Sequence, residues 1–133
     1  MSGVFADTSF YVAIVSRRDQ LHARAIATAA KIVGPIVTTE FVRLETANFC
    51  VEGRKRAVYL RLIAKLRESP NVEIIPATST AFQRGLELFG ARADKDWSLT
   101  DCISIVVMQE CGLTEALTAD RNFEQAGFGA LLA

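Results

Sequence analysis

Short apolar runs alternate along this chain with longer segments in which apolar residues recur every three or four positions. The short runs end at turn-forming residues or at aspartates, which is typical of buried strands. We expect strands at residues 4–6, 36–38, 72–75 and 116–118. The longer segments predict helices over about 9–16, 21–33, 39–52, 55–68, 79–91 and 99–111, with a short helix near 122–126.

Strands that alternate with helices predict an α/β fold. We expect a parallel sheet of four to five strands, flanked by helices on both faces. For the helix over 99–111, Ser98 or Thr100 is the expected cap and Gly112 the expected end. In a parallel sheet of this kind, ligands bind at the carboxyl ends of the strands. The residue that follows each strand is therefore the first candidate for function.

Size and charge limit the classes of function. The 133 residues fit one domain over 1–133, and 15 Lys and Arg balance 15 Asp and Glu. A net charge of zero argues against coating nucleic acid through bulk charge, so any such binding needs a local patch. The longest apolar runs, such as Ile105 to Met108, are far shorter than the roughly 18 residues that span a bilayer.

Cysteine and histidine usage excludes further chemistry. Three cysteines cannot all pair with one another, and none lies in a C-x-x-C arrangement, so we expect a reduced, cytoplasmic setting and no zinc knuckle. His22 is the single histidine, which disfavours histidine metal sites and Ser-His-Asp catalysis. Acidic chemistry remains.

Four carboxylates stand at informative positions. Asp7 directly follows the first strand, Asp120 follows the fourth, and Asp101 lies in the first turn of the 99–111 helix. Glu45 lies within the 39–52 helix, among residues expected to form its apolar face: Phe41, Val42, Leu44, Phe49 and Val51. Each carboxylate alone is explained by ordinary capping or turn formation. Together they fit a cleft that binds a cation, because converging carboxylates repel one another and oxygen ligands suit Mg²⁺ or Mn²⁺.

Four stretches in order resemble the PIN-domain ribonucleases, and among them the VapC-type toxins of toxin–antitoxin pairs. The resemblance covers essentially the whole chain. The matching stretches are VFADTS at 4–9, VTTEFVRLE at 37–45, DWSLTDC at 96–102 and LTADRNFEQAGF at 117–128.

The resemblance implies a metal site and its ligands. The acidic quartet of the family falls on Asp7, Glu45, Asp101 and Asp120, which would hold one or two Mg²⁺ or Mn²⁺ ions. The family spacing V-x-x-E selects Glu45 rather than Glu40. Supporting contacts are expected from Thr8, Ser9, Thr100 and Asn122. Many relatives carry histidine where this chain has Asn122, and an amide cannot shuttle a proton near neutral pH.

Residues 54–67 contain six basic residues and no acidic one. Arg54, Arg61 and Lys65 share one side of this helix, opposite an apolar side. Two interpretations stay open: a solvated amphipathic helix, or a patch that binds RNA phosphates beside the acidic cleft. Arg121, next to Asp120, is a further RNA-binding candidate. Other candidates are Arg17, Arg18 and Arg92 for phosphates, and Tyr11 and Trp97 for base stacking.

The leading hypothesis is a metal-dependent endoribonuclease that acts as the toxin of a toxin–antitoxin pair, leaving 5′-phosphate and 3′-hydroxyl ends. The alternatives are a housekeeping RNA-processing nuclease of the same fold, a protein that binds RNA without cutting it, and a receiver-type signalling domain. The resemblance implies RNA and a cognate antitoxin as partners, with no membrane. It also implies a homodimer, for which the apolar residues of the first two helical segments are candidates.

Overall fold

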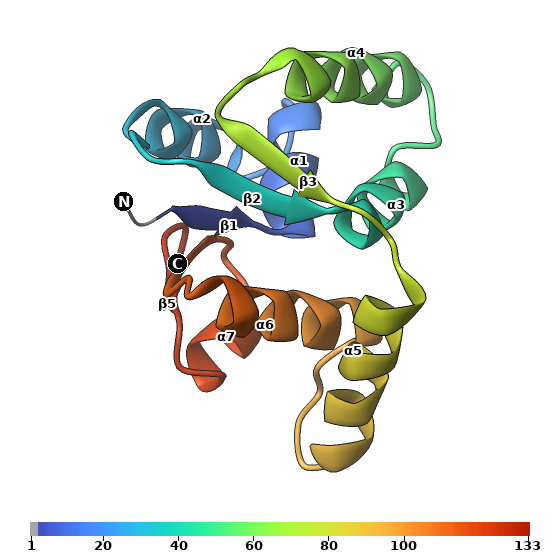
Figure 1. Ribbon diagram of the computed structural model, residues 1–133. Helices are drawn as coiled ribbons and strands as arrows, with labels where there is room; N and C mark the ends of the chain where they lie inside the picture. The colour runs from blue at the N-terminus through green and yellow to red at the C-terminus, as the bar shows by residue number, and fades with distance from the viewer. Residues whose placement is uncertain (1–2) are drawn as a thin grey trace.

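Five parallel strands form one sheet in the computed structural model, which describes residues 3–133 (Figure 1). Their order across the sheet is β3-β2-β1-β4-β5. The strands are β1 (Val4–Ala6), β2 (Ile36–Thr39), β3 (Val72–Ile75), β4 (Glu115–Leu117) and β5 (Gly129–Ala130). The predicted α/β class and parallel sheet are confirmed.

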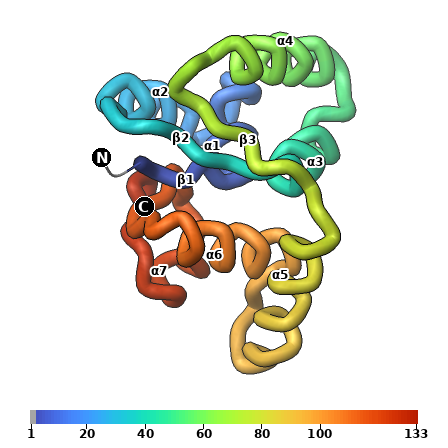
Figure 2. Tube along the Cα trace, in the orientation of Figure 1, coloured from blue at the N-terminus to red at the C-terminus, as the bar shows by residue number. Residues whose placement is uncertain are grey.

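Helices cover both faces of the sheet (Figures 1 and 2). One face carries α1, α2 and α4, and the other carries α6 and α7, with α5 packed against α6. At the carboxyl edge of the strands, α3 contacts both α1 and α6. The helices are α1 (Thr8–Val15), α2 (His22–Ala30), α3 (Glu40–Phe49), α4 (Lys55–Glu68), α5 (Ser79–Ala91), α6 (Leu99–Cys111) and α7 (Arg121–Gln125).

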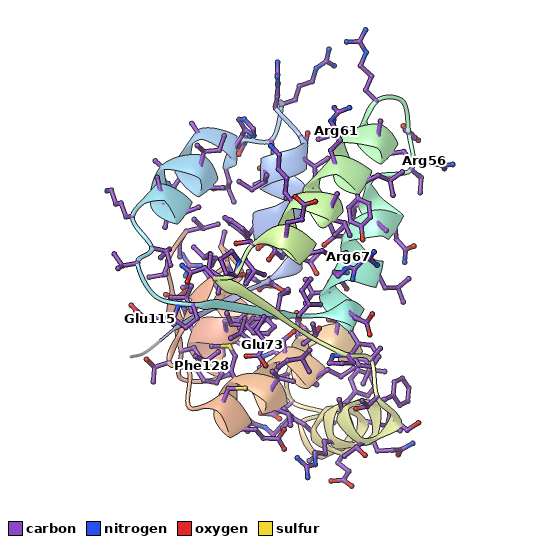
Figure 3. The ribbon with its side chains drawn as sticks, turned by 45° about the horizontal axis from the view of Figure 1, so that its top comes forward. Arg56, Arg61, Arg67, Glu73, Glu115 and Phe128 are labelled. Atoms are coloured by element: carbon purple, nitrogen blue, oxygen red, sulfur yellow. The ribbon has the colours of Figure 1, made fainter. Side chains whose placement is uncertain are left out.

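The central strand β1 is buried along its whole length. It pairs with β2 on one side and β4 on the other, and helices lie over both faces, so a run of three apolar residues is what this position requires. The edge strand β3 has one fully exposed position, Glu73 (Figure 3).

Most predicted boundaries agree with the structure to within a few residues. The strands at 4–6 and 72–75 and the helices over 55–68, 79–91 and 99–111 coincide with the observed elements. Ser98 caps α6, and Gly112 ends it in the left-handed conformation, with φ 69°. The predicted helices over 21–33 and 39–52 end earlier, at Ala30 and Phe49.

The predicted apolar face of α3 is wrong in part. Val42 is fully buried, but Leu44 and Phe49 are each 62% exposed and Val51 is 52% exposed. The buried stripe of α3 instead runs through Val42 and Thr46, four residues apart, which face the core. Leu44 points away from that stripe, and Val51 lies beyond the end of the helix.

The expected dimer surface on the first two helical segments is narrow on α1. Phe10, Tyr11, Ala13 and Val15 lie in the core, because α1 packs between the sheet and its neighbouring helices, and only Val12 and Ile14 are partly exposed. On α2, Ile26 is 49% exposed.

The strand order leaves a crevice at one place on the carboxyl edge. From β1 the chain builds outward through β2 to β3, then crosses the sheet and returns as β4 on the other side of β1. Such a reversal separates the loops that follow β1 and β4, and ligands of open α/β sheets bind there. Within residues 3–133, no helix is long and apolar enough to cross a membrane.

Candidate active site

Asp7 leaves β1 at the crevice and is almost completely buried, with 3% of its surface exposed. The Thr118 hydroxyl, at the end of β4, donates a hydrogen bond of 2.9 Å to Asp7 Oδ2. The Ser9 hydroxyl lies 3.3 Å from the same oxygen. The other oxygen, Asp7 Oδ1, is buried and has no hydrogen-bond partner among the described residues. A buried carboxylate oxygen in this state is suited to a cation.

Asp101 has a structural and an electrostatic role at the start of α6. The Ser98 hydroxyl accepts the backbone N–H of Asp101 at 3.0 Å, and Asp101 Oδ2 accepts the backbone N–H of Ser98 at 3.1 Å. This reciprocal capping box fixes the carboxylate against the helix terminus. Asn122 Nδ2 donates to the same oxygen at 3.2 Å, which leaves Asp101 Oδ1 for a ligand.

Asp120 caps α7, with Oδ1 accepting the backbone N–H of Asn122 at 2.9 Å. The Asn122 amide lies between Asp120 Oδ2, at 3.5 Å, and Asp101, so it links two carboxylates. The Asn122 amide therefore holds these two carboxylates next to each other.

Glu45 reaches the same region from α3. The Thr8 hydroxyl donates a hydrogen bond of 2.5 Å to Glu45 Oε1, which ties the first residue of α1 to α3. Glu45 is partly buried.

All four predicted carboxylates line one pocket of about 380 Å³, together with Thr8, Ser9, Val12, Ser98 and Phe49. We call it the carboxylate pocket. Asp19 also lines it, from the turn between α1 and α2, and it was not predicted because it follows no strand. Thr118 was missed as well, although a polar residue at the end of an apolar strand was a usable signal. Thr100 is partly buried and does not line the pocket.

Burial and mutual repulsion shift the acidity of this cluster. The pKa of Asp7 rises from 3.8 to about 7, mainly because burial disfavours the charged form, with further contributions from the Asp101 and Glu45 charges. Burial also raises the pKa of Asp101, and the charge of Asp120 adds to this. The four side chains therefore form one electrostatic group, in which a bound cation would relieve the repulsion.

The donor set fits a hard divalent cation. It consists of carboxylate and hydroxyl oxygens, and it includes a buried oxygen of Asp7 that lacks a partner. Within residues 3–133, no three His, Cys, Asp or Glu side chains are grouped closely enough to hold a metal ion by themselves. An ion such as Mg²⁺ would bind here through one or two carboxylates and would keep several water ligands.

Four of the predicted RNA-binding residues lie together, and the other three do not join them. Arg54 and Arg61 line a second pocket, of about 860 Å³, together with Arg17 and Arg18. Lys65 is exposed further along α4 and does not line this pocket. Two other candidates lie elsewhere: Arg121 is exposed at the start of α7, and Arg92 pairs with Asp94.

The two aromatic candidates for base stacking are buried. Trp97 is 6% exposed; its Nε1 donates to Gln125 Oε1 at 3.1 Å, and the Arg92 guanidinium lies over its ring. Tyr11 is 3% exposed and packs edge-on against Phe10. Neither ring is open to a nucleobase.

Comparisons with known proteins agree with this geometry. A family model described as PIN domain matches residues 4–129. The 23S rRNA-specific endonuclease VapC20 of Mycobacterium tuberculosis, from strains CDC 1551 and H37Rv, is 28% identical over 127 residues, covering 94% of this chain and 95% of that protein. The crystal structure of M. tuberculosis VapC20, described as a toxin that cleaves the sarcin–ricin loop, superposes with a TM-score of 0.85 at 25% identity. That match covers 94% of this chain and 95% of the other.

Proposed function

The chain belongs to the PIN-domain family as a VapC-type RNA-cleaving hydrolase, and we propose that it hydrolyses RNA with one or two divalent ions bound at the carboxylate pocket. The observation that carries this proposal is the buried Asp7 carboxylate at the crevice, which has one unpartnered oxygen and four other carboxylates around its pocket. The ion is Mg²⁺ or Mn²⁺, and residues 1–133 act as a single domain.

Each proposed ligand is oriented by a neighbour. Thr118 holds Asp7 Oδ2, so that Oδ1 faces a ligand, and Thr8 holds Glu45. Asn122 and the capping box hold Asp101. When bound, the ion supplies positive charge that activates water and offsets the charge that develops on the phosphodiester. Asp7 then stays ionised, because the cation replaces the solvation that burial removes.

The proposed products carry 5′-phosphate and 3′-hydroxyl ends, because water rather than the 2′-hydroxyl of the RNA is the nucleophile. The first substrate to test is 23S rRNA, which the similar M. tuberculosis endonuclease cleaves according to its description. A housekeeping role in RNA processing would use the same chemistry on other transcripts. The two roles differ in which RNAs are cut.

The test is a transcriptome-wide map of new RNA 5′ ends after brief induction, comparing the wild type with Asp101→Asn. The matched control is Asp96→Asn, an exposed carboxylate five residues earlier that does not line the pocket. We expect sharp new 5′-phosphate ends with the wild type and the control, and none with Asp101→Asn. Equal cleavage by Asp101→Asn, or 2′,3′-cyclic phosphate ends, would contradict the proposal.

The proposed partner besides RNA is a cognate antitoxin in the cytoplasm. An antitoxin arginine placed among the carboxylates would satisfy them in place of the cation, since guanidinium and carboxylate pair strongly. A small gene directly upstream is the place to look for it. Its product should form a complex with this chain and abolish cleavage, and failure of both would argue for the housekeeping role.

The homodimer is proposed to form through α5. Phe82, Leu86 and Phe89 are 38%, 41% and 47% exposed and are spaced at positions i, i+4 and i+7, so they share one face of that helix, where the Phe82 ring also lies 6.3 Å from the ring of Phe41. A different face of α5 packs against α6. Light scattering should show a dimer for the wild type and a monomer for Leu86→Glu. A wild-type monomer, or a dimer that survives Leu86→Glu, would remove this surface.

A further inference from the structure

Two pockets lie one after the other along the same pair of segments. The carboxylate pocket is lined by Thr8 and Val12 from α1 and by Glu45 and Phe49 from α3. The second pocket is lined by the end of α1, by the segment that follows α3, and by the first half of α4.

The lining residues place these pockets next to each other. On α1 and its end, positions 8 and 12 line the carboxylate pocket and positions 15–16 line the second pocket. On α3, positions 45 and 49 line the carboxylate pocket, and positions 52–53, just after the helix, line the second pocket. Since α1 packs against α3, the two pockets are neighbours along the same pair of segments. We treat them as two stretches of one surface, which we call the α1–α3 groove.

The far stretch of the groove is strongly basic. It gathers five of the 15 basic residues of a chain with zero net charge, against one acidic residue, Glu52. All five are exposed, and none forms an ion pair within the described part of the chain. Figure 3 shows Arg61 on the first half of α4 and Arg67 near its end. The five are Arg17, Arg18, Arg54, Lys55 and Arg61.

Such a concentration of like charges repels itself and is relieved by a polyanion. A neutral protein that acts on RNA needs a local patch of this kind, because phosphate contacts supply most of the affinity. The position of the patch also matters. Since α1 has eight residues and rises about 1.5 Å per residue, its two ends lie about 12 Å apart, with Thr8 of the carboxylate pocket at one end and Val15 of the second pocket at the other. The basic stretch would therefore hold the phosphates of neighbouring nucleotides rather than the one that is cut.

Phe49 lies between the two stretches. It lines the carboxylate pocket, stands at the last position of α3, and exposes 62% of its surface. A large aromatic ring in water next to a candidate nuclease site is suited to stacking a splayed base. The sequence pattern placed Phe49 in the core and offered Tyr11 and Trp97 instead, and both of these are buried.

We propose that the α1–α3 groove binds a single-stranded segment of the RNA substrate. Phosphates bind in the basic stretch, a base stacks on Phe49, and the next phosphodiester reaches the carboxylates. This inference rests on the proposed function and adds to it the residues that would position the RNA beside the cut: the basic stretch and Phe49. The basic stretch lies next to the carboxylate pocket, and this favours RNA over an acidic protein as the occupant.

Binding is tested with a fluorescein-labelled RNA hairpin that carries the sarcin–ricin loop and single-stranded flanks. All proteins carry Asp101→Asn so that the RNA stays intact. The test variant is Arg54→Gln with Arg61→Gln, and the control is Arg67→Gln, an exposed arginine on the same helix outside the pocket. Losing two phosphate contacts should reduce the slope of log affinity against log salt by about 1.4, since each single-strand contact contributes about 0.7. The control should change neither slope nor affinity.

The stacking role is tested by Phe49→Ala, with Phe49→Trp as the conservative variant and Phe49→Leu as an apolar, non-aromatic control. Phe49→Ala and Phe49→Leu should weaken hairpin binding by about tenfold, and Phe49→Trp should retain it. In the active protein, these losses should appear in KM with kcat nearly unchanged. Full binding by Phe49→Leu would overturn the stacking role.

Shortening the RNA distinguishes failure of this inference from failure of the proposed function. Removing nucleotides from the flank that occupies the basic stretch should abolish the difference between the wild type and the arginine variant. If the wild type cuts RNA but the arginine variant matches Arg67→Gln in slope and KM, the groove proposal is wrong and the basic pocket serves a protein partner. If the wild type cuts no RNA, the proposed function fails, and the binding assay still decides whether the groove holds RNA.

Discussion

The two ends of the α1–α3 groove are built in opposite ways. At the carboxylate end, Asp7 and Asp101 are buried and held by hydroxyl, amide and backbone groups from four separate segments of the chain. At the basic end, the arginines and Lys55 are exposed and extend from the turn after α1 and from the first half of α4. The acidic side chains are therefore packed within the fold, whereas the basic side chains lie on its surface. Substitutions at the acidic end should strongly affect cleavage and stability, and substitutions at the basic end should affect RNA binding with little effect on stability.

The largest effect is expected from Asp7→Asn or Asp101→Asn. Either change removes a proposed ligand charge, so cleavage should fall by about 100- to 1000-fold, the order seen when a charge-stabilising group is lost. The fold should persist, because asparagine keeps the shape and an oxygen acceptor. Cleavage assays and circular dichroism check this, with Asp96→Asn as the control. Full activity in either variant would refute the quartet.

The next effect concerns pH. The pKa of Asp7 is about 7 in the folded protein and 3.8 when unperturbed, so the folded state binds the proton more tightly. Stability of the metal-free protein should therefore fall as pH rises from about 4 to 7, by up to about 4 kcal/mol from this group alone. Urea unfolding in EDTA at several pH values, compared with Asp7→Asn, isolates the contribution. Parallel curves for the two proteins would contradict it.

A smaller effect is expected from Thr118→Val, which keeps the shape and removes the hydroxyl. Asp7 Oδ2 loses the closer of its two hydroxyl donors and keeps Ser9, and the Asp120 backbone N–H loses an acceptor at 3.0 Å. Mutating a residue that hydrogen-bonds a metal ligand typically lowers metal affinity or activity 10- to 100-fold. We therefore expect kcat to fall by about that factor and the Mn²⁺ concentration needed for activity to rise. The control is Thr114→Val, an exposed threonine just before β4. An unchanged Mn²⁺ titration would show that Thr118 does not position Asp7.

The smallest effect is expected on stability at the basic end. Arg54→Gln with Arg61→Gln should change the free energy of unfolding by less than about 0.5 kcal/mol, in the stabilising direction because repulsion is relieved. Urea unfolding at low salt measures it. A destabilisation above about 1 kcal/mol would mean that these side chains support the fold, and the contrast between the two ends would disappear.

Most helices and strands were predicted from the sequence because short stretches of neighbouring residues determine where each element begins and ends. The strand at 4–6 and the helix over 99–111 are defined by apolar runs, a cap and a terminal glycine, all readable in short windows. The acidic positions were readable too, since Asp7 and Asp120 follow strands. That these carboxylates share one pocket follows from strand order, which no local window contains.

Exposure was the property that the sequence predicted least well. Phe49 is an apolar residue of the kind found in cores, but α3 ends at that position. The buried face of the helix is instead formed by Val42 and Thr46. The grouping of Arg17 with Arg54 was equally out of reach, because it depends on the end of α1 meeting the start of α4. Both depend on tertiary packing rather than on periodicity.

The placement of β4 beside β1 has a consequence for biosynthesis. Thr118 bonds to Asp7 across 111 positions of the chain, and Asp120 follows it. While the chain is being translated, β1, Asp7 and Glu45 emerge long before residues 115–120 do. Until that late strand is made and pairs with β1, Asp7 lacks the Thr118 hydroxyl donor, and the carboxylate pocket lacks Asp120. The topology thus delays assembly of the pocket until nearly all of this sequence has been translated, so a chain that stops before β4 lacks the complete pocket.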